Sequence, residues 1–417
     1  MSRRRVLAGP DLPEQVVATP DAFRACLEHL RTTDCIGLDT EFVGEESYRP
    51  ELCLIQVATP SRLLLIDPFA CGDLSPFWTL MLDPNRVVVV HAGREEVRMC
   101  WYAIGKPPAA IFDVQIASAL VGYTYPIGYA GLVQEAIGAR ASKAETLTDW
   151  RRRPLSVNQI RYAYDDVRYL LPLWRGLSER LVRWNRTTWA TEEFEAFVRH
   201  SILDDPSIEK WRKLKGLGGL NRRELAVARE VFVWREQFAA RLNRPPRVLL
   251  RDDIVIEIAR RGSGRQDDLH TLRGLPRGEG DAILMAVRRG HELPLDQCPP
   301  TSERDSDAPH INTLASLLGV VLSEFCARMK LASNLVATTY DLKSLVRARQ
   351  PGAKLADDSS FISGWRSQEV RPHLDAVLDG TQVIRVSNPG SANPITIHPI
   401  SPNTDVSATN QSTDEGD

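Results

Sequence analysis

Residues 35–42 read CIGLDTEF, an apolar run that ends in two acids with one residue between them. Successive side chains of a strand point to opposite faces, so Asp39 and Glu41 share one face at a spacing of about 7 Å. Two carboxylates at the end of a buried strand repel one another and lose hydration, and a divalent cation removes that cost. Because carboxylate oxygens are hard ligands, the pair predicts a site for Mg²⁺ or Mn²⁺ and not for zinc.

Apolar runs further along the chain extend this strand into a sheet. Strands are predicted at ELCLIQVA (51–58), RLLLID (62–67) and VVVVH (87–91), with Pro, Gly, Asp and Ser marking the turns between them. The first three strands are close enough along the chain to form an antiparallel meander. The spacing of apolar residues predicts helices over 75–82, 93–104, 114–122, 128–137 and 156–184. A mixed sheet with helices packed on it is an α/β or α+β layer fold.

Two more acidic sites follow within the same region. HAGREE (91–96) comes directly after an apolar strand and offers Glu95 and Glu96. In RYAYDDVRYL, Tyr162 and Asp166 are four residues apart, which places the phenol and the carboxylate on one helix face. Each motif alone is typical of an ordinary surface turn or helix start. Their combination with the first acidic pair predicts a site built from several carboxylates.

The strand signal ends near residue 205, and two helical segments follow, over 207–292 and 310–380. EQFAARLN (236–243) aligns with SEFCARMK (323–330), which indicates a weak internal repeat. A polar, proline-containing linker, 298–310, separates the two segments. From residue 387 onward the chain has too little periodic apolar content to build a core, so the tail is predicted to be disordered.

Composition and charge restrict the classes of protein that remain. The seven cysteines form no CxxC pair and are predicted to be buried thiols of a reducing, cytoplasmic protein. No run approaches 18 apolar residues and no signal peptide is seen, so no membrane segment is expected. The net charge is −2, yet residues 209–289 carry 19 Lys and Arg against 11 Asp and Glu. That excess fits either a polyanion-binding surface or solvated helix faces.

The order and spacing of these motifs resemble the tyrosine-bearing branch of the DEDD exonuclease superfamily, and most closely the ribonuclease D family. The resemblance covers residues 20–185 and rests on four stretches: YRPELCLIQVA (48–58), LIDP (65–68), HAGREE (91–96) and KAETLTDWRRRPLSVNQIRYAYDDVRYLL (143–171). The segment 207–292 resembles an HRDC domain, a helical nucleic-acid-binding module. The segment 310–380 looks like a second, diverged HRDC-like domain.

The resemblance implies an architecture and an activity. The expected parts are an α/β ribonuclease H-like exonuclease domain (15–190), two small all-α HRDC-like domains (205–293 and 308–384) and a disordered tail (387–417). The implied activity is 3′–5′ exoribonucleolytic release of nucleoside 5′-monophosphates with two divalent cations, Mg²⁺ or Mn²⁺. Asp39, Glu41, Glu96 and Asp166 would hold the cations, and Tyr162 would orient or deprotonate the attacking water.

The implied partner is RNA with a free 3′ end, with transfer RNA precursors as the family expectation. The protein is expected to act as a monomer without an organic cofactor. Candidate RNA contacts are Phe42 and His91 near the carboxylates, and the basic residues Lys143, Arg151 and Arg152 as phosphate contacts. Each has a structural alternative: packing of Phe42 under the sheet, a core hydrogen bond of His91, and a solvated arginine loop.

Position 96 departs from the family pattern, which usually has Asp there. The longer glutamate keeps the charge, so activity is expected with an altered metal preference, and Glu95 is a fallback for the same role. Two rival functions stay open: a 3′–5′ exonuclease acting on DNA, and a catalytically decayed RNA-binding scaffold. The catalytic residues cannot separate RNA from DNA, whereas metal-dependent release of nucleotide would separate an enzyme from a scaffold.

Overall fold

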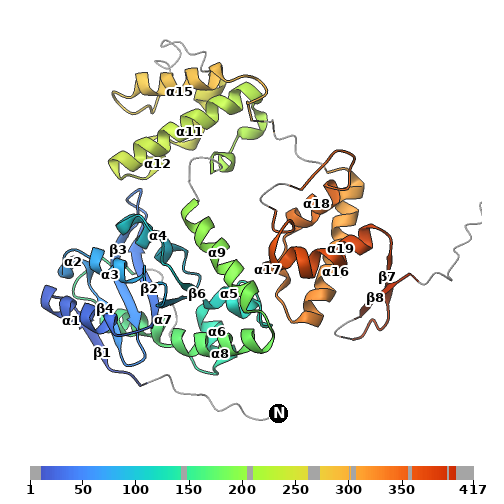
Figure 1. The fold of residues 1–417 in the computed structure, drawn as a ribbon. Coiled ribbons are helices and arrows are strands. Elements are labelled where there is room, and N and C mark those ends of the chain that lie inside the picture. The colour runs from blue at the N-terminus through green and yellow to red at the C-terminus, as the bar shows by residue number, and fades with distance from the viewer. Residues whose placement is uncertain are drawn as a thin grey trace, which may run out of the picture. The chain divides into compact units, whose positions relative to one another are not determined.

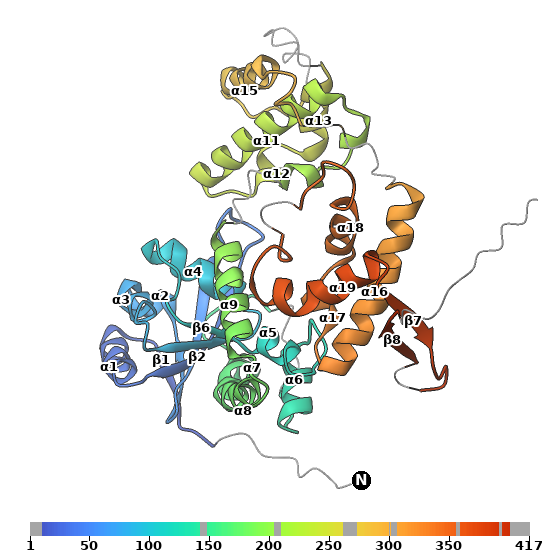
Figure 2. The ribbon, with the colours of Figure 1, turned by 45° about the vertical axis from the view of Figure 1, so that its right-hand side comes forward.

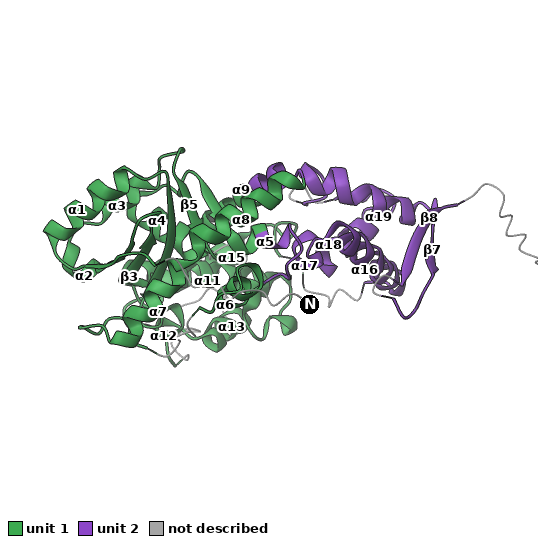
Figure 3. Ribbon diagram, turned by 90° about the horizontal axis from the view of Figure 1, so that it is seen from below, with its two compact units in different colours: residues 1–117, 127–184, 193–306 green, residues 118–126, 185–192, 307–417 purple. Residues whose placement is uncertain are grey.

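The computed structural model of the 417-residue chain describes residues 11–141, 148–203, 210–261, 273–299, 301, 307–355, 359–391 and 394–400. The chain divides into two compact units, coloured separately in Figure 3. Unit 1 comprises residues 1–117, 127–184 and 193–306, and unit 2 comprises residues 118–126, 185–192 and 307–417. Unit 2 is therefore assembled from three separate stretches of the sequence.

The first 113 residues of unit 1 contribute a six-stranded mixed sheet (Figure 1), with the strand order β1-β4-β3-β2-β5-β6. Its strands are β1 (Glu14–Val17), β2 (Cys35–Val43), β3 (Glu51–Ala58), β4 (Leu63–Ile66), β5 (Val87–Val90) and β6 (Ile111–Asp113). Strands β2, β3 and β4 form the predicted antiparallel meander, and the other neighbours pair in parallel. Sequence analysis missed β1 and β6, which are short outer strands with too few residues to show a period.

Helices cover both faces of this sheet. On one face, α1 (Pro20–Arg31), α3 (Ser75–Leu80) and α4 (Arg94–Ile104) bury a core that includes Ile36 and Leu38 of β2. On the other face, α7 (Val157–Arg168) and α8 (Leu170–Arg183) pack against β2. A β-carbon at Gly37 would lie 3.0 Å from Cβ of Leu170, so glycine at this position lets α8 approach the strand closely.

The helix predicted over 156–184 is instead two helices that meet at Tyr169. Pro172 explains the break, because it lacks an N–H and its ring collides with the carbonyl four residues earlier, that of Arg168. Helix α7 begins with a capping box, in which Ser156 and Gln159 each bind the backbone of the other. The remaining helices of this region are α2 (Pro68–Cys71), α5 (Val114–Ala119), α6 (Tyr129–Ala136) and α9 (Thr187–Leu203).

The helical segment that begins at Lys210 and ends at Glu292, in unit 1, has a hydrophobic core of its own. It consists of α11 (Arg222–Leu242), α12 (Pro246–Leu249), α13 (Asp252–Arg261) and α15 (Gly280–Glu292), preceded by the short turns η1 (Lys210–Lys213) and η2 (Leu217–Gly219). Trp211, Phe232 and Ile258 are among its buried residues. A β-carbon at Gly290 would lie 2.6 Å from the Cα of Val227, so glycine is what allows α15 to cross α11 at this distance.

Unit 2 repeats this helix order at the same spacing. Helix α16 (Pro309–Met329) has 21 residues, as α11 has, and the two end at left-handed residues, Lys330 and Asn243. Helices α17 (Ser333–Val336) and α12 each begin three residues later, and α18 (Thr339–Arg347) and α13 each begin nine residues later. The aligned pairs Arg241–Phe238 and Arg328–Phe325 both place a guanidinium over an aromatic ring. The helices thus follow the internal repeat seen in the sequence.

Unit 2 ends in a short π-helical turn, η3 (Arg366–Val370), helix α19 (Arg371–Leu378) and an antiparallel hairpin of β7 (Gln382–Val386) and β8 (Ile395–Pro399), visible in Figure 2. The hairpin corrects the expectation of disorder from residue 387. Each of its strands is only five residues long, which is too little for a pattern to stand out beside the surrounding Ser, Asn and Pro. Residues 401–417 lie outside the described part of the chain.

Helix α16 is long and apolar enough to cross a membrane by length and composition alone, a feature that the sequence analysis did not identify. Its buried side chains, which include Leu318, Val321 and Phe325, face α18 and α19 within unit 2. This packing is typical of the central helix of a folded domain.

Candidate active site

Four carboxylates from three elements come together at one end of the sheet. Asp39 and Glu41 lie on β2, Glu96 lies in the first turn of α4, and Asp166 lies in α7. Burial raises the pKa of Asp39 well above its usual range, and the charges of Glu96, Asp166 and Glu41 add to the increase. The charge of one carboxylate raises the pKa of another in this way only when the two lie close together. The four predicted acids therefore form one cluster.

The other three carboxyl groups have raised pKa values as well. Burial and then Glu96 raise the pKa of Glu41 to about 7. Burial and then Glu41 raise the pKa of Asp166 to about 8, although a hydrogen bond with Tyr162 opposes the increase. Burial raises the pKa of Glu96 to about 7, against a hydrogen bond from Thr40. Without a cation, the cluster therefore retains protons near neutral pH.

Glu96, and not Glu95, belongs to this cluster. The Thr40 hydroxyl donates to Oε1 of Glu96 over 2.7 Å, and Glu96 is only 5% exposed. Glu95 instead pairs with Arg98, whose Nη1 lies 2.9 Å from Oε1. Sequence analysis did not single out Thr40, because its side chain leaves β2 on the opposite face from Asp39 and meets Glu96 only in the folded protein.

The turn before α4 is held by a buried aspartate that the sequence analysis missed. Asp113, at the end of β6, accepts hydrogen bonds from the backbone N–H groups of Ala92 and Gly93, over 3.2 and 3.1 Å. Ala92 has a left-handed φ of 54°, and a β-carbon at Gly93 would lie 2.4 Å from Val90. Asp113 thus fixes the turn that presents Glu96. The feature of the sequence that could have indicated Asp113 is its position at the end of a short apolar run.

Tyr162 lies beside Asp166 one helical turn away, as the sequence spacing predicts. Its ring packs against Trp150, with ring centroids 6.1 Å apart. Burial raises the pKa of Tyr162, and the neighbouring charges of Asp166 and Glu41 add to the increase. The phenol is therefore protonated at neutral pH and acts as a hydrogen-bonding group.

The chemistry of the cluster fits divalent cations. Oδ2 of Asp166 is buried without a hydrogen-bond partner, and the clustered oxygens are hard ligands of the kind that Mg²⁺ and Mn²⁺ prefer. In the ranges that the structure describes, no three Asp, Glu, His or Cys side chains already converge at metal-ligand distances. A bound cation would stabilise the ionised forms of these carboxylates and draw their oxygens together.

Phe42 and His91, proposed from sequence as RNA contacts, both have partners within unit 1. Phe42 is half-buried against the core beneath the sheet, next to a register shift in β2. Nε2 of His91 lies 2.9 Å from the carbonyl oxygen of Ile127, and its ring meets Tyr129 edge-on. Burial lowers the pKa of His91, so the ring is neutral at physiological pH.

The arginines before α7 differ from one another in their environment. Arg151 pairs with Asp149 and Glu46, at 2.9 and 2.7 Å. The side chain of Arg152 is 84% exposed and lies 3.9 Å from Asp149. Arg153 is a structural residue that the sequence analysis did not separate from its neighbours: it binds the Asp67 carboxylate and three backbone carbonyls. Lys143 lies outside the described residues.

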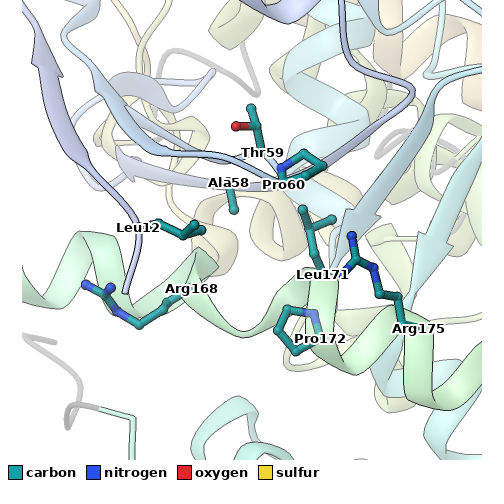
Figure 4. A pocket seen from close by; sticks show the side chains of 8 residues that line it. All are labelled: Leu12, Ala58, Thr59, Pro60, Arg168, Leu171, Pro172 and Arg175. Carbon is teal, nitrogen blue, oxygen red and sulfur yellow. The ribbon is translucent and has the colours of Figure 1, made fainter. Parts of the chain in front are cut away.

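A small cavity of about 70 Å³ lies on the same sheet, and none of the four carboxylates is among the residues that line it, which are drawn in Figure 4. Its lining includes Ala58 of β3 and the arginines Arg168 and Arg175, which project from α7 and α8. Ala58 pairs with Gly37, whereas the acids lie further along β2. The cavity therefore belongs to the other end of the strand.

Known proteins resemble this chain over almost its whole length. A family model described as 3′-5′ exonuclease matches residues 15–182, and an HRDC domain model matches residues 224–281. Ribonuclease D of Gluconacetobacter diazotrophicus is 34% identical over 93% of this chain and 98% of its own. Ribonuclease D of Acidiphilium cryptum is 32% identical over 86% of this chain and 92% of its own.

A solved structure agrees with these matches. The crystal structure of Escherichia coli RNase D, an exoribonuclease involved in structured RNA processing, is similar with a TM-score of 0.74 and 27% identity. The match covers 88% of this chain and 99% of that one. The family resemblance drawn from the sequence motifs and the predicted fold class are thereby confirmed. The chain belongs to the ribonuclease D family of 3′–5′ exoribonucleases.

Proposed function

We propose that this chain shortens RNA from its 3′ end one nucleotide at a time, using two divalent cations held by Asp39, Glu41, Glu96 and Asp166. The observation that carries the proposal is the group of four carboxylates whose pKa values are raised by burial and by one another. Burying four acids side by side costs folding free energy, since their ionised forms lose hydration and repel one another. Bound cations would offset that cost because they stabilise the ionised carboxylates.

Each residue has a distinct part in the proposed reaction. Asp39 is influenced by all three other acids, so it would contact both cations. Glu41 and Asp166 would complete the ligands of one cation, and Glu96 those of the other. When bound, two cations lower the pKa of a water molecule and neutralise charge on the attacking and leaving oxygens. The product would be a nucleoside 5′-monophosphate.

Tyr162 would orient the attacking water through its hydroxyl group. Its raised pKa keeps the phenol protonated, which makes it a poor base at neutral pH. Of the two roles considered from the sequence, orientation by a hydrogen bond is therefore the better supported. Thr40 would hold Glu96 in place, since its hydroxyl binds the carboxylate in the absence of any ligand.

The helical segments would grip the RNA upstream of the site. We propose an exonuclease domain over 15–190, an HRDC domain over 205–293 and a second, diverged HRDC-like domain that begins near residue 308. The same helix spacing in the two helical segments supports the last of these. Arg152, the most exposed arginine of its run, is the best-placed phosphate contact, while Phe42, His91, Lys143 and Arg151 stay weaker candidates.

We further propose transfer RNA precursors as a substrate and a monomer as the active form. Escherichia coli RNase D, a solved structure similar to this chain, is described as an exoribonuclease involved in structured RNA processing. All seven cysteines are free and buried, which fits a reducing compartment such as the cytoplasm.

A timed digestion of 5′-labelled single-stranded RNA tests the proposed mechanism. Wild type would be compared with Asp39→Ala in Mg²⁺, in Mn²⁺ and in EDTA. The expected result is a ladder of shortening RNA that disappears in EDTA and in the variant. Wild type that binds RNA and leaves it intact with either cation would instead indicate a scaffold.

The matching DNA strand, digested in parallel, separates RNA from DNA as the substrate. Two-metal hydrolysis does not use the 2′-hydroxyl, so the catalytic carboxylates permit either polymer. Faster shortening of the RNA is expected from the family, and equal rates would favour the DNA exonuclease alternative.

A further inference from the structure

Gln56 of β3 is a fully buried amide beside the carboxylate cluster. Its side chain is 0% exposed, and it pairs directly with Asp39 in the antiparallel register of β2 and β3. Directly opposite residues of an antiparallel pair point to the same face, with their β-carbons about 5 Å apart. The amide therefore lies next to the carboxyl group that is central to the proposed site.

Both polar atoms of Gln56 lack a hydrogen-bond partner within the described part of the chain. Nε2 of Gln159 and Oδ2 of Asp166, two further buried atoms without a partner, lie on α7, the helix that packs over β3 and β2. A buried polar group without a partner costs stability, and buried amides in native proteins almost always find one. One of these atoms, Oδ2 of Asp166, belongs to a proposed cation ligand, and Gln56 lies beside another such ligand, Asp39.

Packing alone does not account for a glutamine at this position. The residues of β3 that share its face, Leu54 and Ala58, are buried and apolar, and its partner on the other side is Leu65 of β4. A methionine or leucine would fill the same space without an unsatisfied amide. An ionised carboxylate only accepts hydrogen bonds, whereas the Gln56 amide nitrogen donates two.

We propose that Gln56 is a positioning residue for Asp39. When Asp39 is ionised and holds a cation, Nε2 of Gln56 donates a hydrogen bond to the carboxylate and fixes its orientation. Oε1 of Gln56, which also lacks a partner, would be free to accept a hydrogen bond from a water molecule in the loaded site. The inference rests on the proposed function, because it requires Asp39 to hold the cation. Removing a group that orients a metal ligand typically costs about 10- to 100-fold in metal affinity or activity.

The test compares full-length wild type with Gln56→Met, which keeps the length of the side chain and removes its polar atoms. Calorimetric titration with Mn²⁺ would give the affinity, and RNA digestion would give kcat and KM. The expected result is an affinity lowered by about 10- to 100-fold, a lower kcat at limiting cation with KM for RNA unchanged, and recovery at high Mg²⁺. The melting temperature of the metal-free variant is expected to stay equal or rise, because the unsatisfied amide is gone.

Leu65→Met is the matched control, since it makes a similar packing change at the neighbouring position and is expected to leave the affinity unaltered. If Gln56→Met does not fold, Gln56→Leu replaces it. A side-chain amide signal of Gln56 that becomes protected from hydrogen exchange on Mg²⁺ addition would support the inference independently in wild type.

An unchanged Mn²⁺ affinity in the folded Gln56 variant overturns the inference. A lowered metal-free melting temperature with unchanged affinity would mark Gln56 as a packing residue. If Asp39→Ala loses the cation while Gln56→Met binds it normally, only the role of Gln56 fails. If Asp39→Ala binds the cation as well as wild type, the proposed function fails, and the role of Gln56 with it.

Discussion

At the scale of single residues, the hydroxyl group of Thr40 holds Glu96, a contact that the acidic motifs of the sequence do not indicate. The Thr40 hydroxyl donates to Oε1 of Glu96, and both residues are buried. Thr40→Val keeps the shape of the side chain and removes this hydrogen bond. We expect cation affinity or exonuclease rate to fall by about 10- to 100-fold, as for other groups that orient a metal ligand. Calorimetry and RNA digestion measure the two quantities.

Thr40→Ser is the matched control, because it retains the hydroxyl group. It should keep most of the activity that Thr40→Val loses. Equal behaviour of the two variants would show that Thr40 contributes packing to β2 and does not position Glu96.

The raised pKa values of the cluster predict an unusual pH dependence of stability. Glu41 and Glu96 have folded-state pKa values of about 7, and Asp166 of about 8, all above the values near 4 of an unfolded chain. The folded metal-free protein therefore holds protons on these groups that the unfolded chain has lost, and their contribution to the free energy of unfolding falls as pH rises from about 5 to 8. The melting temperature should fall by about 2–4 °C for each kcal/mol lost.

Mg²⁺ should reverse this trend, because it stabilises the ionised carboxylates, and its effect on the melting temperature should grow with pH. Glu41→Gln should flatten the metal-free profile. Aspartates with lowered pKa values, Asp149 and Asp307, titrate below this window and do not obscure it. A metal-free melting temperature that is constant from pH 5 to 8 would contradict the prediction.

Individual site residues were predictable to different degrees. Asp39 and Glu41 follow from a strand period, and Tyr162 and Asp166 from a helix period, so local sequence is sufficient to find them. Thr40, Asp113 and Gln56 depend on which strand or helix lies opposite. That information comes from tertiary register, which a local period does not contain.

At the scale of elements, the buried strands were the most predictable. β3 was predicted at its observed bounds, and β2 to within one residue, because an apolar run between turn residues has few alternatives. The division of the helix over 156–184 was missed although Pro172 was visible, since a proline in the first turn of a following helix leaves the apolar period intact. The β7–β8 hairpin was missed because its strands carry no long apolar run.

The crossing of α11 and α15 depends on one glycine. A β-carbon at Gly290 would lie 2.6 and 2.8 Å from backbone atoms of Val227, which cannot move as a side chain could. Gly290→Ala should therefore force the helices apart and cost about 1–3 kcal/mol. Thermal unfolding followed by circular dichroism should show an earlier transition of the helical segment, while hydrolysis of very short RNA stays near that of wild type.

Gly280→Ala is the control, because nothing lies within 4 Å of the added β-carbon and the residue is in the same helix. It should be neutral or slightly stabilising. Comparable destabilisation by both variants would show that helix propensity, and not the close crossing, is responsible.

At the scale of the whole molecule, the uneven distribution of charge predicts salt-dependent RNA binding. Residues 209–289 carry eight more basic than acidic side chains in a chain of net charge −2. The logarithm of affinity for single-stranded RNA should fall against that of salt concentration with a slope of about −0.7 for each phosphate neutralised. Fluorescence anisotropy at a series of salt concentrations measures the slope.

Arg152→Ala should reduce the steepness of this slope by about 0.7, the contribution of one phosphate contact. Arg24→Ala is the control, since that side chain on α1 is also largely exposed, at 72%. If RNA affinity did not depend on salt concentration, residues 209–289 would not be an RNA-binding surface. Equal slopes for the two variants would show that Arg152 does not contact a phosphate.

Unit 2 is built from three separate stretches of chain that bind one another. Nη1 of Arg186 donates to the carbonyl oxygen of Leu120, and Nη2 to that of Met329. The rings of Trp189 and Trp365 stack with centroids 4.8 Å apart. Composition and helix period predicted the helices of this unit, but not that segments from the first half of the chain would belong to it.

This construction determines the order in which the chain can fold during synthesis. All six strands of the large sheet have been made by residue 113, so the carboxylate-bearing sheet has its parts early. Trp189 is made long before Trp365, and at translation rates of roughly 5–20 residues per second the interval is on the order of 9–35 s. During that time its ring lacks the Trp365 ring that stacks on it in the folded unit. The ribosome therefore delivers the sheet that carries Asp39 and Glu41 first, and unit 2 can close only when the chain is nearly complete.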